Sequence, residues 1–187
     1  MCFNIGKDAK SLFEKLKDKD VQTYIHCQST ATLAVKIAEV YREKFGKSLE
    51  IEEVFFAGLF HDYGKLSFAN DLINGTLIIS NPKDNHEILR HPQVGVTMLS
   101  SVIHSKSVLD GIKHHHERLD GSGYPYGLKG DDIPIIAKII SVADTFDAMT
   151  TPRGYKRTLS RNQAISILEK ENHLFDKNIV SILKLSS

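Results

Sequence analysis

Helical spacing of apolar residues runs through this chain, and no segment alternates between apolar and polar residues at the period of two that a half-buried β-strand needs. Between residues 20 and 45, for example, Leu33, Ile37 and Tyr41 are spaced for one helix face, and Gly46 is suited to end that helix. No internal repeat or low-complexity linker interrupts the pattern. The sequence therefore predicts an all-α fold, a compact bundle of about seven to nine helices.

The second predicted helix is the most apolar part of the chain. Ser48 is suited to cap it, and its residues 54–60 are apolar on nearly every side, which predicts deep burial. We expect a connecting loop over 64–81, a helix that begins at Pro82 and stops before Pro92, and a separate helix after it. The remaining helix starts carry residues that accept hydrogen bonds from backbone N–H groups: Ser107, Asp131 or Asp132 before a helix over 135–150, Ser160 with Gln163, and Asp176.

The segment 120–130 holds four glycines in eleven residues and follows directly on a histidine run at the end of a predicted helix. So many glycines are incompatible with a regular helix or strand, and they predict a structured loop. Loops of this kind often carry binding or catalytic residues. The segment is therefore a candidate functional loop.

The composition is that of a soluble globular protein of one domain, with 187 residues, 41% of them hydrophobic and 25% charged. Twenty-four Lys and Arg against 23 Asp and Glu leave a net charge of +1, which gives no overall attraction to a nucleic-acid polymer or a membrane. The longest apolar stretch, 54–60, is far shorter than the roughly 20 residues of a membrane helix, and no signal peptide core is present. Only Cys2 and Cys27 occur, which suits a reducing compartment. We therefore expect a cytoplasmic protein.

Histidines are concentrated in the middle of the chain, where seven of the nine fall between His61 and His116. Asp62 and Asp144 lie beside apolar sequence that should be buried, and an unpaired buried carboxylate is costly. A divalent cation would remove that cost, because His61 offers a neutral imidazole and Asp62 can bridge two ions. Seven candidate ligands suit two hard or borderline cations: His26, His61, Asp62, His91, His115, His116 and Asp144.

Each of these residues taken alone has an ordinary structural explanation. A lone buried Asp is often satisfied by helix N–H groups or by Arg, and a single His-Asp dipeptide is more often coincidence than a metal site. The whole set favours metal binding. We expect His114 to take no part in the site, and three histidines with polar or charged neighbours to lie at the surface: His86, His104 and His173.

Four motifs follow one another along the chain: HDYGK at 61–65, HPQVG at 91–95, HHExxDGSGYP at 115–125 and VADTFDAM at 142–149. Any one of them is a weak signal, but together and in this order they closely resemble the HD-GYP phosphodiesterases of the HD superfamily of metal-dependent phosphohydrolases. The resemblance extends from about His26 to Leu183. It implies an HD-domain-like bundle in which 1–19 form a short N-terminal helical arm and 20–187 the catalytic domain.

By resemblance, the seven candidate ligands match the metal ligands of the family, whose usual ions are iron or manganese. Some members carry a Glu one helical turn before the residue that matches His26 and bind a third ion, but this chain has Gln22 there. We therefore expect two divalent ions, with Asp62 and Lys65 as the catalytic residues.

The resemblance also assigns residues to the substrate. Lys65 matches a lysine beside the metal site, and Arg153 and Lys156 match basic residues associated with phosphate, so that three cations would offset the charge of a diester. The expected substrate contacts are Lys65, Gly123, Tyr124, Pro125, Asp147, Arg153 and Lys156.

Some positions depart from the family pattern. Tyr63 and Gly154 replace the more usual Ile and Pro, and 67–80 follow the family's loop only loosely, which concerns substrate fit rather than metal binding. The name-giving segment 121–125 is expected to line the nucleotide pocket or to contact a signalling protein, and a purely structural turn is an equal alternative.

These features predict a cyclic dinucleotide phosphodiesterase, with cyclic di-GMP as the leading substrate and linear pGpG, and after a further step GMP, as products. Two ions would lower the pKa of a shared water, and the hydroxide would attack phosphorus while Lys65, Arg153 and Lys156 hold the other phosphate oxygens. Two alternatives stay open: an HD-superfamily phosphohydrolase that acts on another nucleotide or phosphoester, and a catalytically idle module that binds the dinucleotide or a partner. A homodimer also stays open.

Overall fold

The computed structural model describes residues 7–68, 86–152 and 158–185. Within these ranges the chain forms eight α-helices, two short 3-10 helices and no strand, so the all-α prediction and the expected number of helices are confirmed. The α-helices are α1 (Lys7–Lys19), α2 (Val21–Phe45), α3 (Ile51–Phe60), α5 (His86–Leu99), α6 (Lys106–His114), α7 (Ile135–Thr150), α8 (Arg161–Lys170) and α9 (Lys177–Ile182). The 3-10 helices are η1 (Tyr63–Ser67) and η3 (Gly130–Asp132).

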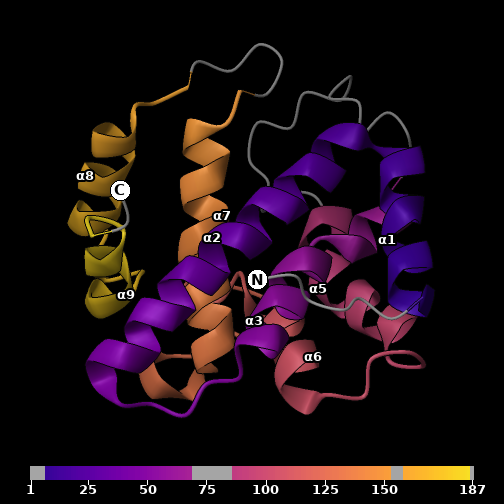
Figure 1. The fold of residues 1–187 in the computed structure, drawn as a ribbon, viewed down its shortest axis with the longest axis horizontal. Helices are drawn as coiled ribbons and strands as arrows, with labels where there is room; N and C mark the ends of the chain where they lie inside the picture. The colour runs from indigo at the N-terminus through magenta and orange to yellow at the C-terminus, as the bar shows by residue number, and fades with distance from the viewer. Residues whose placement is uncertain (1–6, 69–85, 153–157, 186–187) are drawn as a thin grey trace.

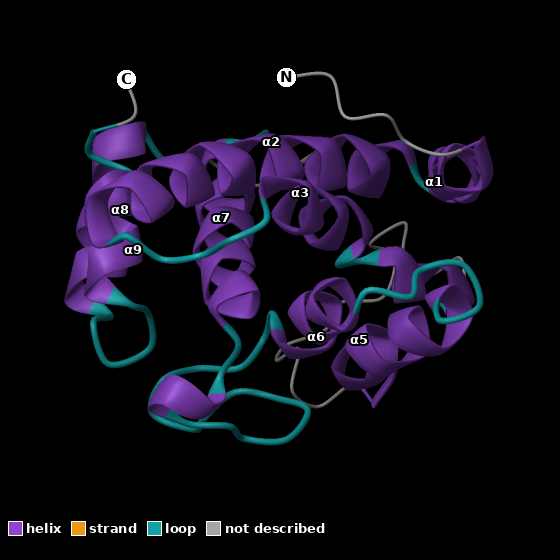
Figure 2. Cartoon of the chain, turned by 60° about the horizontal axis from the view of Figure 1, so that its bottom comes forward, coloured by secondary structure: helices purple, strands orange, loops and turns teal. Residues whose placement is uncertain are grey.

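Helix α2 crosses the bundle diagonally in Figure 1, and α3 and α7 pack against it. Helices α8 and α9 lie at one end of the bundle and α1 at the other. Helix α6 packs against α3, α5 and α7, and the glycine-rich segment leaves its end as a long loop, which Figure 2 shows at the bottom of the view. The chain therefore brings the ends of α3 and α6 to the inner faces of α2, α5 and α7.

The core of the bundle is apolar, and the second predicted helix is at its centre. Val54 and Phe60 are fully buried, as are Ile37 of α2, Ile112 of α6 and Ile140 of α7. Burial of apolar surface is the main favourable term in folding. The predicted deep burial of 54–60 is confirmed for most of its residues, and no helix in the described part of the chain is long and apolar enough to cross a membrane.

Several predicted helix limits are confirmed by their capping contacts. The Asp20 carboxylate accepts hydrogen bonds from two N–H groups in the first turn of α2, and Gly46 ends that helix with a φ of 60°. Ser160 and Gln163 form the predicted capping box before α8. Asp176 caps α9.

Three predicted caps are wrong by two or more residues. Helix α3 follows Glu50 rather than Ser48. Ser105 rather than Ser107 caps α6, because its hydroxyl accepts from the N–H of Val108 and also donates to Glu53, a contact between distant segments. Helix α7 has the predicted bounds 135–150 but follows Pro134, and Asp131 and Asp132 lie in η3 instead.

The predicted break at Pro92 is also wrong, because α5 continues through it. The loop expected over 64–81 begins as η1, and its remainder, with the helix start at Pro82, lies outside the described residues. The reason that α5 tolerates a proline is found in the site itself.

Candidate metal centre

The seven predicted ligands meet where the ends of α3 and α6 face α2, α5 and α7. Their candidate ligand atoms form three groups, within each of which all atoms lie within 4.8 Å of one another. The groups are Asp62 with His91, His115 and His116; His26 with His61 and Asp62; and His61 with His115 and Asp144. Asp62, His61 and His115 each belong to two groups. Of these three, only Asp62 has two oxygens that could each bind a different ion, which is what a bridging residue needs.

Three of these histidines are oriented by a backbone carbonyl three residues earlier in the chain. The distances from Nδ1 to the carbonyl oxygen are 2.7 Å for His61 and Gly58, 2.5 Å for His91 and Ile88, and 2.7 Å for His115 and Ile112. A carbonyl can only accept, so each Nδ1 carries a proton. The other ring nitrogen, Nε2, is then the lone-pair atom that a metal would use.

These carbonyls are available because each lacks its usual helical partner. In an α-helix the carbonyl of one residue accepts from the N–H four residues later, and the last carbonyls of a helix have no such partner. Gly58 and Ile112 lie in the last turns of α3 and α6. Ile88 lies inside α5, but the residue four positions later is Pro92, which has no N–H. The proline inside α5 therefore offers no backbone N–H to the carbonyl that orients His91.

The same geometry leaves buried lone pairs facing one another. Asp62 Oδ1 lies 3.1 Å from His91 Nε2, and that nitrogen lies 3.4 Å from His115 Nε2. Among the described residues, Asp62 Oδ1 and His61 Nε2 are buried without a hydrogen-bond partner. Unpaired buried polar atoms are costly, and a cation between them would remove the cost. The donor set of imidazole nitrogens and carboxylate oxygens therefore fits divalent metal ions.

Burial sets the protonation of the imidazoles. It lowers the pKa of His91, and with the positive charge of neighbouring histidines it holds the pKa values of His115 and His116 well below the usual range. Burial would also lower the pKa of His61, but the Asp62 carboxylate outweighs it and raises that pKa well above the usual value. Neutral imidazole is the form that binds metal, and a cation beside Asp62 would take the place of the proton on His61.

The two carboxylates of the cluster are held in their ionised form. Burial alone would raise the pKa of Asp62, but Lys65 and His61 outweigh it and hold that pKa well below its usual range. For Asp144 the opposing effect comes mainly from the hydrogen bond and charge of His26. Lys65 Nζ donates to Asp62 Oδ2 at 2.5 Å, and its side chain is 28% exposed. A cation of the protein thus stands at the open side of the cluster.

Helix η1 brings Asp62 and Lys65 to α5 through a close backbone contact. A Cβ on Gly64 would lie 2.0 Å from the carbonyl oxygen of His91 and 2.7 Å from the N of Gly95. Only glycine allows this approach. The glycines of the HDYGK and HPQVG motifs therefore have a packing reason.

The glycine-rich segment is the structured loop that its sequence predicts, and it folds back on the end of α6 before entering η3. Glu117, 2% exposed, accepts hydrogen bonds from the backbone N–H of Tyr126 at 2.8 Å and of Leu128 at 3.0 Å. A Cβ on Gly123 would lie 2.4 Å from the N of Arg118, so the loop backbone touches the helix end. The sequence reasoning missed Glu117; its signal is an acidic residue between a histidine run and a glycine-rich loop.

The loop places Tyr124 beside the cluster. The ring of Tyr124 lies with its centroid 4.6 Å from that of His116, and its peptide bond to Pro125 is cis. Of the predicted substrate contacts, Lys65, Gly123 and Tyr124 therefore lie beside candidate ligands.

Arg118, which the sequence reasoning also missed, donates a hydrogen bond to Ser141 Oγ at 2.7 Å and so ties the end of α6 to α7.

Of the predicted substrate contacts other than Lys65 and the loop residues, the structure describes only Asp147. Arg153 and Lys156, with Gly154, lie outside the described residues. Asp147 is buried, and its carboxylate contacts His26 and Thr151. Tyr63, an exception to the family pattern, is 2% exposed and packs its ring edge to face with Phe60 in the core.

The remaining histidines are placed as expected. His114 belongs to none of the three groups, although it is buried with its ring against Tyr126. His86, His104 and His173 are exposed.

Comparisons with known proteins agree with this geometry. The family model described as HD domain matches residues 10–179. A cyclic di-GMP phosphodiesterase of Pseudomonas aeruginosa is 36% identical over 166 residues, which cover 88% of this chain and 39% of that protein. The 3'3'-cGAMP-specific phosphodiesterase 1 of Vibrio cholerae is 34% identical over 88% of this chain and 35% of its own length. The chain thus spans less than half the length of these two relatives.

A solved structure shares the fold. Bd1817, an HDG"Y"P protein from Bdellovibrio bacteriovorus, matches with a TM-score of 0.64 at 21% identity, over 89% of this chain and 52% of that one. Identity at this level supports the fold alone. The family model, in contrast, spans most of the chain, including every candidate ligand. The chain therefore belongs to the HD domain family, as its resemblance to the HD-GYP phosphodiesterases predicts.

Proposed function

We propose that this chain is a metal-dependent phosphodiesterase that hydrolyses a cyclic dinucleotide, with cyclic di-GMP opened to linear pGpG as the leading reaction. The observation that carries the proposal is the set of buried imidazole nitrogens and carboxylate oxygens around Asp62, which face one another and have Lys65 at their open side. The curated relatives named as cyclic dinucleotide phosphodiesterases support the substrate class.

Two ions would be held by the residues of the cluster. The first would have ligands from α2 and the end of α3, and the second from α5 and the end of α6, with the Asp62 carboxylate shared. Imidazole and carboxylate ligands suit iron or manganese, which are the metals we propose. Ions so bound would lower the pKa of a water molecule and offset the negative charge of the phosphate.

The chain's own residues would position the diester. Lys65 lies next to Asp62 and is partly exposed, so its ammonium group can reach a non-bridging phosphate oxygen. Arg153 and Lys156 would add positive charge, on the resemblance alone. Tyr124, together with Gly123 and Pro125, would form the wall of the pocket next to His116. Charge placed where it builds in the transition state lowers the barrier.

A second substrate is favoured by one comparison. The relative from Vibrio cholerae is named for 3'3'-cGAMP and covers the same 88% of this chain as the relative named for cyclic di-GMP. Both substrates have the same diester ring and differ in one base. Hydrolysis of either would satisfy the proposed chemistry.

We also propose a cytoplasmic location, on the low cysteine content. The outer face of the glycine-rich loop, where Tyr126 is 49% exposed, is the surface we propose for a signalling-protein partner, with a homodimer as the other form to test.

The direct test uses protein purified without oxygen and loaded with iron or manganese. It is incubated with cyclic di-GMP and, separately, with 3'3'-cGAMP, and the products are separated by chromatography beside an Asp62→Ala control. Linear dinucleotide made only by the unmutated protein is the expected result. Bound metal without turnover of either substrate would point to another phosphoester, and binding of the dinucleotide without metal would indicate an idle module.

A further inference from the structure

His26 differs from the three histidines that backbone carbonyls orient. It lies inside α2, where the carbonyl three residues earlier, that of Thr23, belongs to the regular helical ladder. No proline follows four positions after that residue, since position 27 is Cys27. The carbonyl of Thr23 is therefore not offered to Nδ1 of His26 in the way that the corresponding carbonyls are offered to the other three histidines.

Asp147, from α7, provides a partner for Nδ1 of His26. Its Oδ2 lies 2.6 Å from His26 Nδ1, and its Oδ1 accepts from the hydroxyl of Thr151 at 2.8 Å. The hydroxyl of Thr30 also lies 3.4 Å from Nδ1, which is too long for a strong bond. Asp147 is 6% exposed, so its carboxylate is held behind the imidazole.

The other face of the ring is directed at the cluster. His26 Nε2 lies 2.9 Å from Asp144 Oδ1 and 3.9 Å from Asp62 Oδ2. Carboxylate, imidazole and candidate ligands thus form one line, from Asp147 through His26 to the site. A carboxylate behind a ligating histidine fixes the ring and increases its basicity, and its loss typically weakens metal binding about 10- to 100-fold.

We infer that Asp147 is a positioning residue for His26, and not the substrate contact that the sequence led us to expect. The ion that His26 helps to hold depends on a side chain of α7 besides the Gly58 carbonyl that orients His61, whereas the ion at His91 and His115 depends on backbone carbonyls. This inference rests on the proposed metal centre but not on the identity of the substrate.

The experiment is a titration of the metal-free full chain with Mn²⁺ by isothermal calorimetry. We compare the unmutated protein with Asp147→Ala, Asp147→Asn and, as a control at an exposed position, Asp131→Ala. Asp147→Ala is expected to weaken one of the two ions about 10- to 100-fold and leave the other unchanged. Asp147→Asn keeps an acceptor for Nδ1 and is expected to recover most of that affinity, which also guards against a variant that folds poorly.

A double-mutant cycle makes the inference specific to His26. In a His26→Ala background, Asp147→Ala is expected to have no further effect on Mn²⁺ binding, because the residue that it positions is gone. A further loss in that background, or unchanged Mn²⁺ binding by Asp147→Ala, would overturn the inference. A raised KM for cyclic di-GMP with normal metal binding would restore the substrate-contact role. Failure of the unmutated protein to bind Mn²⁺ would instead contradict the proposed metal centre itself.

Discussion

The cluster of candidate ligands and the glycine-rich loop beside it are held by different kinds of contact. His61, His91 and His115 are each fixed by the backbone carbonyl three residues earlier. The middle of the loop is held by one buried side chain, Glu117, whose two oxygens accept from two backbone N–H groups, and backbone hydrogen bonds such as that from Gly130 to Leu119 hold its ends. The cluster should therefore respond mainly to changes that alter the backbone, and the loop to the loss of a single carboxylate.

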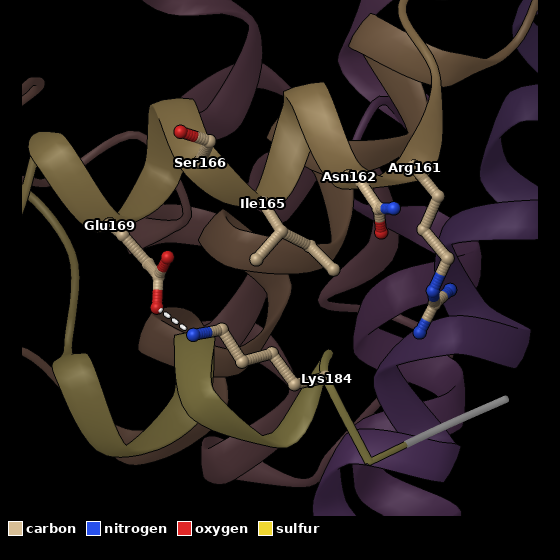
Figure 3. Close-up of a pocket in the computed structure, with 6 residues that line it drawn as sticks. All are labelled: Arg161, Asn162, Ile165, Ser166, Glu169 and Lys184. Atoms are coloured by element: carbon tan, nitrogen blue, oxygen red, sulfur yellow. Dashed lines mark ion pairs between the residues drawn. The ribbon is translucent and has the colours of Figure 1, made fainter.

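An exposed ion pair near the C-terminus provides a contrast to these buried contacts. Polar surface near the C-terminus, shown in Figure 3, is lined by α8 and by Lys184, whose ammonium group pairs with Glu169 at 2.5 Å. Both groups are about half exposed, and exposed pairs contribute little to stability. Glu117 lies at the opposite extreme, because its side chain is buried and both of its carboxylate oxygens accept backbone hydrogen bonds.

The largest effect should follow the loss of Glu117. Glu117→Ala leaves the N–H groups of Tyr126 and Leu128 without their acceptor, and each hydrogen bond to a charged group is worth about 1.5–3 kcal/mol. We expect the free energy of unfolding, measured by urea denaturation, to fall by about 3–6 kcal/mol. Glu117→Gln, with one amide oxygen, should lose about half as much. A loss below about 1 kcal/mol for the alanine variant would mean that the backbone hydrogen bonds of the loop hold it without Glu117.

Next should come the contact that holds η1 against α5. In Gly64→Ala the new Cβ would overlap the carbonyl of His91, which is backbone and cannot swing aside. We expect a destabilisation of about 3 kcal/mol, at the upper end for overpacking, together with weaker Mn²⁺ binding. Gly46→Ala is the matched control: its φ is 60° with nothing within 4 Å, so only backbone strain of about 1–2 kcal/mol is expected and no effect on metal. Equal effects of the two would contradict the packing role.

Pro92→Ala tests the carbonyl that orients His91, since alanine restores an N–H that competes with His91 for the oxygen of Ile88. We expect the ion held by His91 to bind about tenfold more weakly. Alanine is also a much better residue than proline inside a helix, so the free energy of unfolding should rise or stay the same. A variant that binds Mn²⁺ more weakly but unfolds no more easily is the distinctive result. Unchanged Mn²⁺ affinity would show that the carbonyl serves both partners.

The smallest effect is expected at the outer side of the loop. Gln93 of α5 donates to the hydroxyl of Tyr126 at 2.8 Å, at an exposed position. Since Glu117 already fixes this segment, Gln93→Ala should change the free energy of unfolding by less than about 0.5 kcal/mol. A loss comparable to that of Glu117→Ala would remove the distinction between buried and exposed anchors.

The parts of the fold that the sequence predicted are those that depend on neighbouring residues. The spacing of apolar residues and local caps such as Asp20 and the Ser160 box act within one helix, so α2 and α8 were placed correctly. The same reasoning failed for the start of α6, which was expected at Ser107. The cap is Ser105, whose hydroxyl also donates to Glu53 in another helix. It also failed to predict that α5 continues through Pro92. The N–H that proline lacks is replaced by the side chain of His91, which bonds to the carbonyl of Ile88, and the spacing of apolar residues does not reveal this contact.

The candidate ligands could be named from sequence because residue type and resemblance both pointed to them, and the structure brings all seven together. Their role as metal ligands stays a prediction, as does the division into an arm and a catalytic domain. Asp147 and Glu117 are different, since each acts on a residue or loop that only the folded chain places beside it. Sequence shows that such a carboxylate is present, but not which group it faces.

The most direct test of the account counts the Mn²⁺ ions bound by the unmutated protein and by Asp62→Ala in native mass spectrometry, with circular dichroism to confirm that both are folded. Asp62 lies in two of the three ligand groups, so its loss should affect both ions. We predict two ions on the unmutated chain and at most one, weakly held, on the variant. Two ions retained by Asp62→Ala, or none on the unmutated chain, would contradict a centre built around a shared carboxylate.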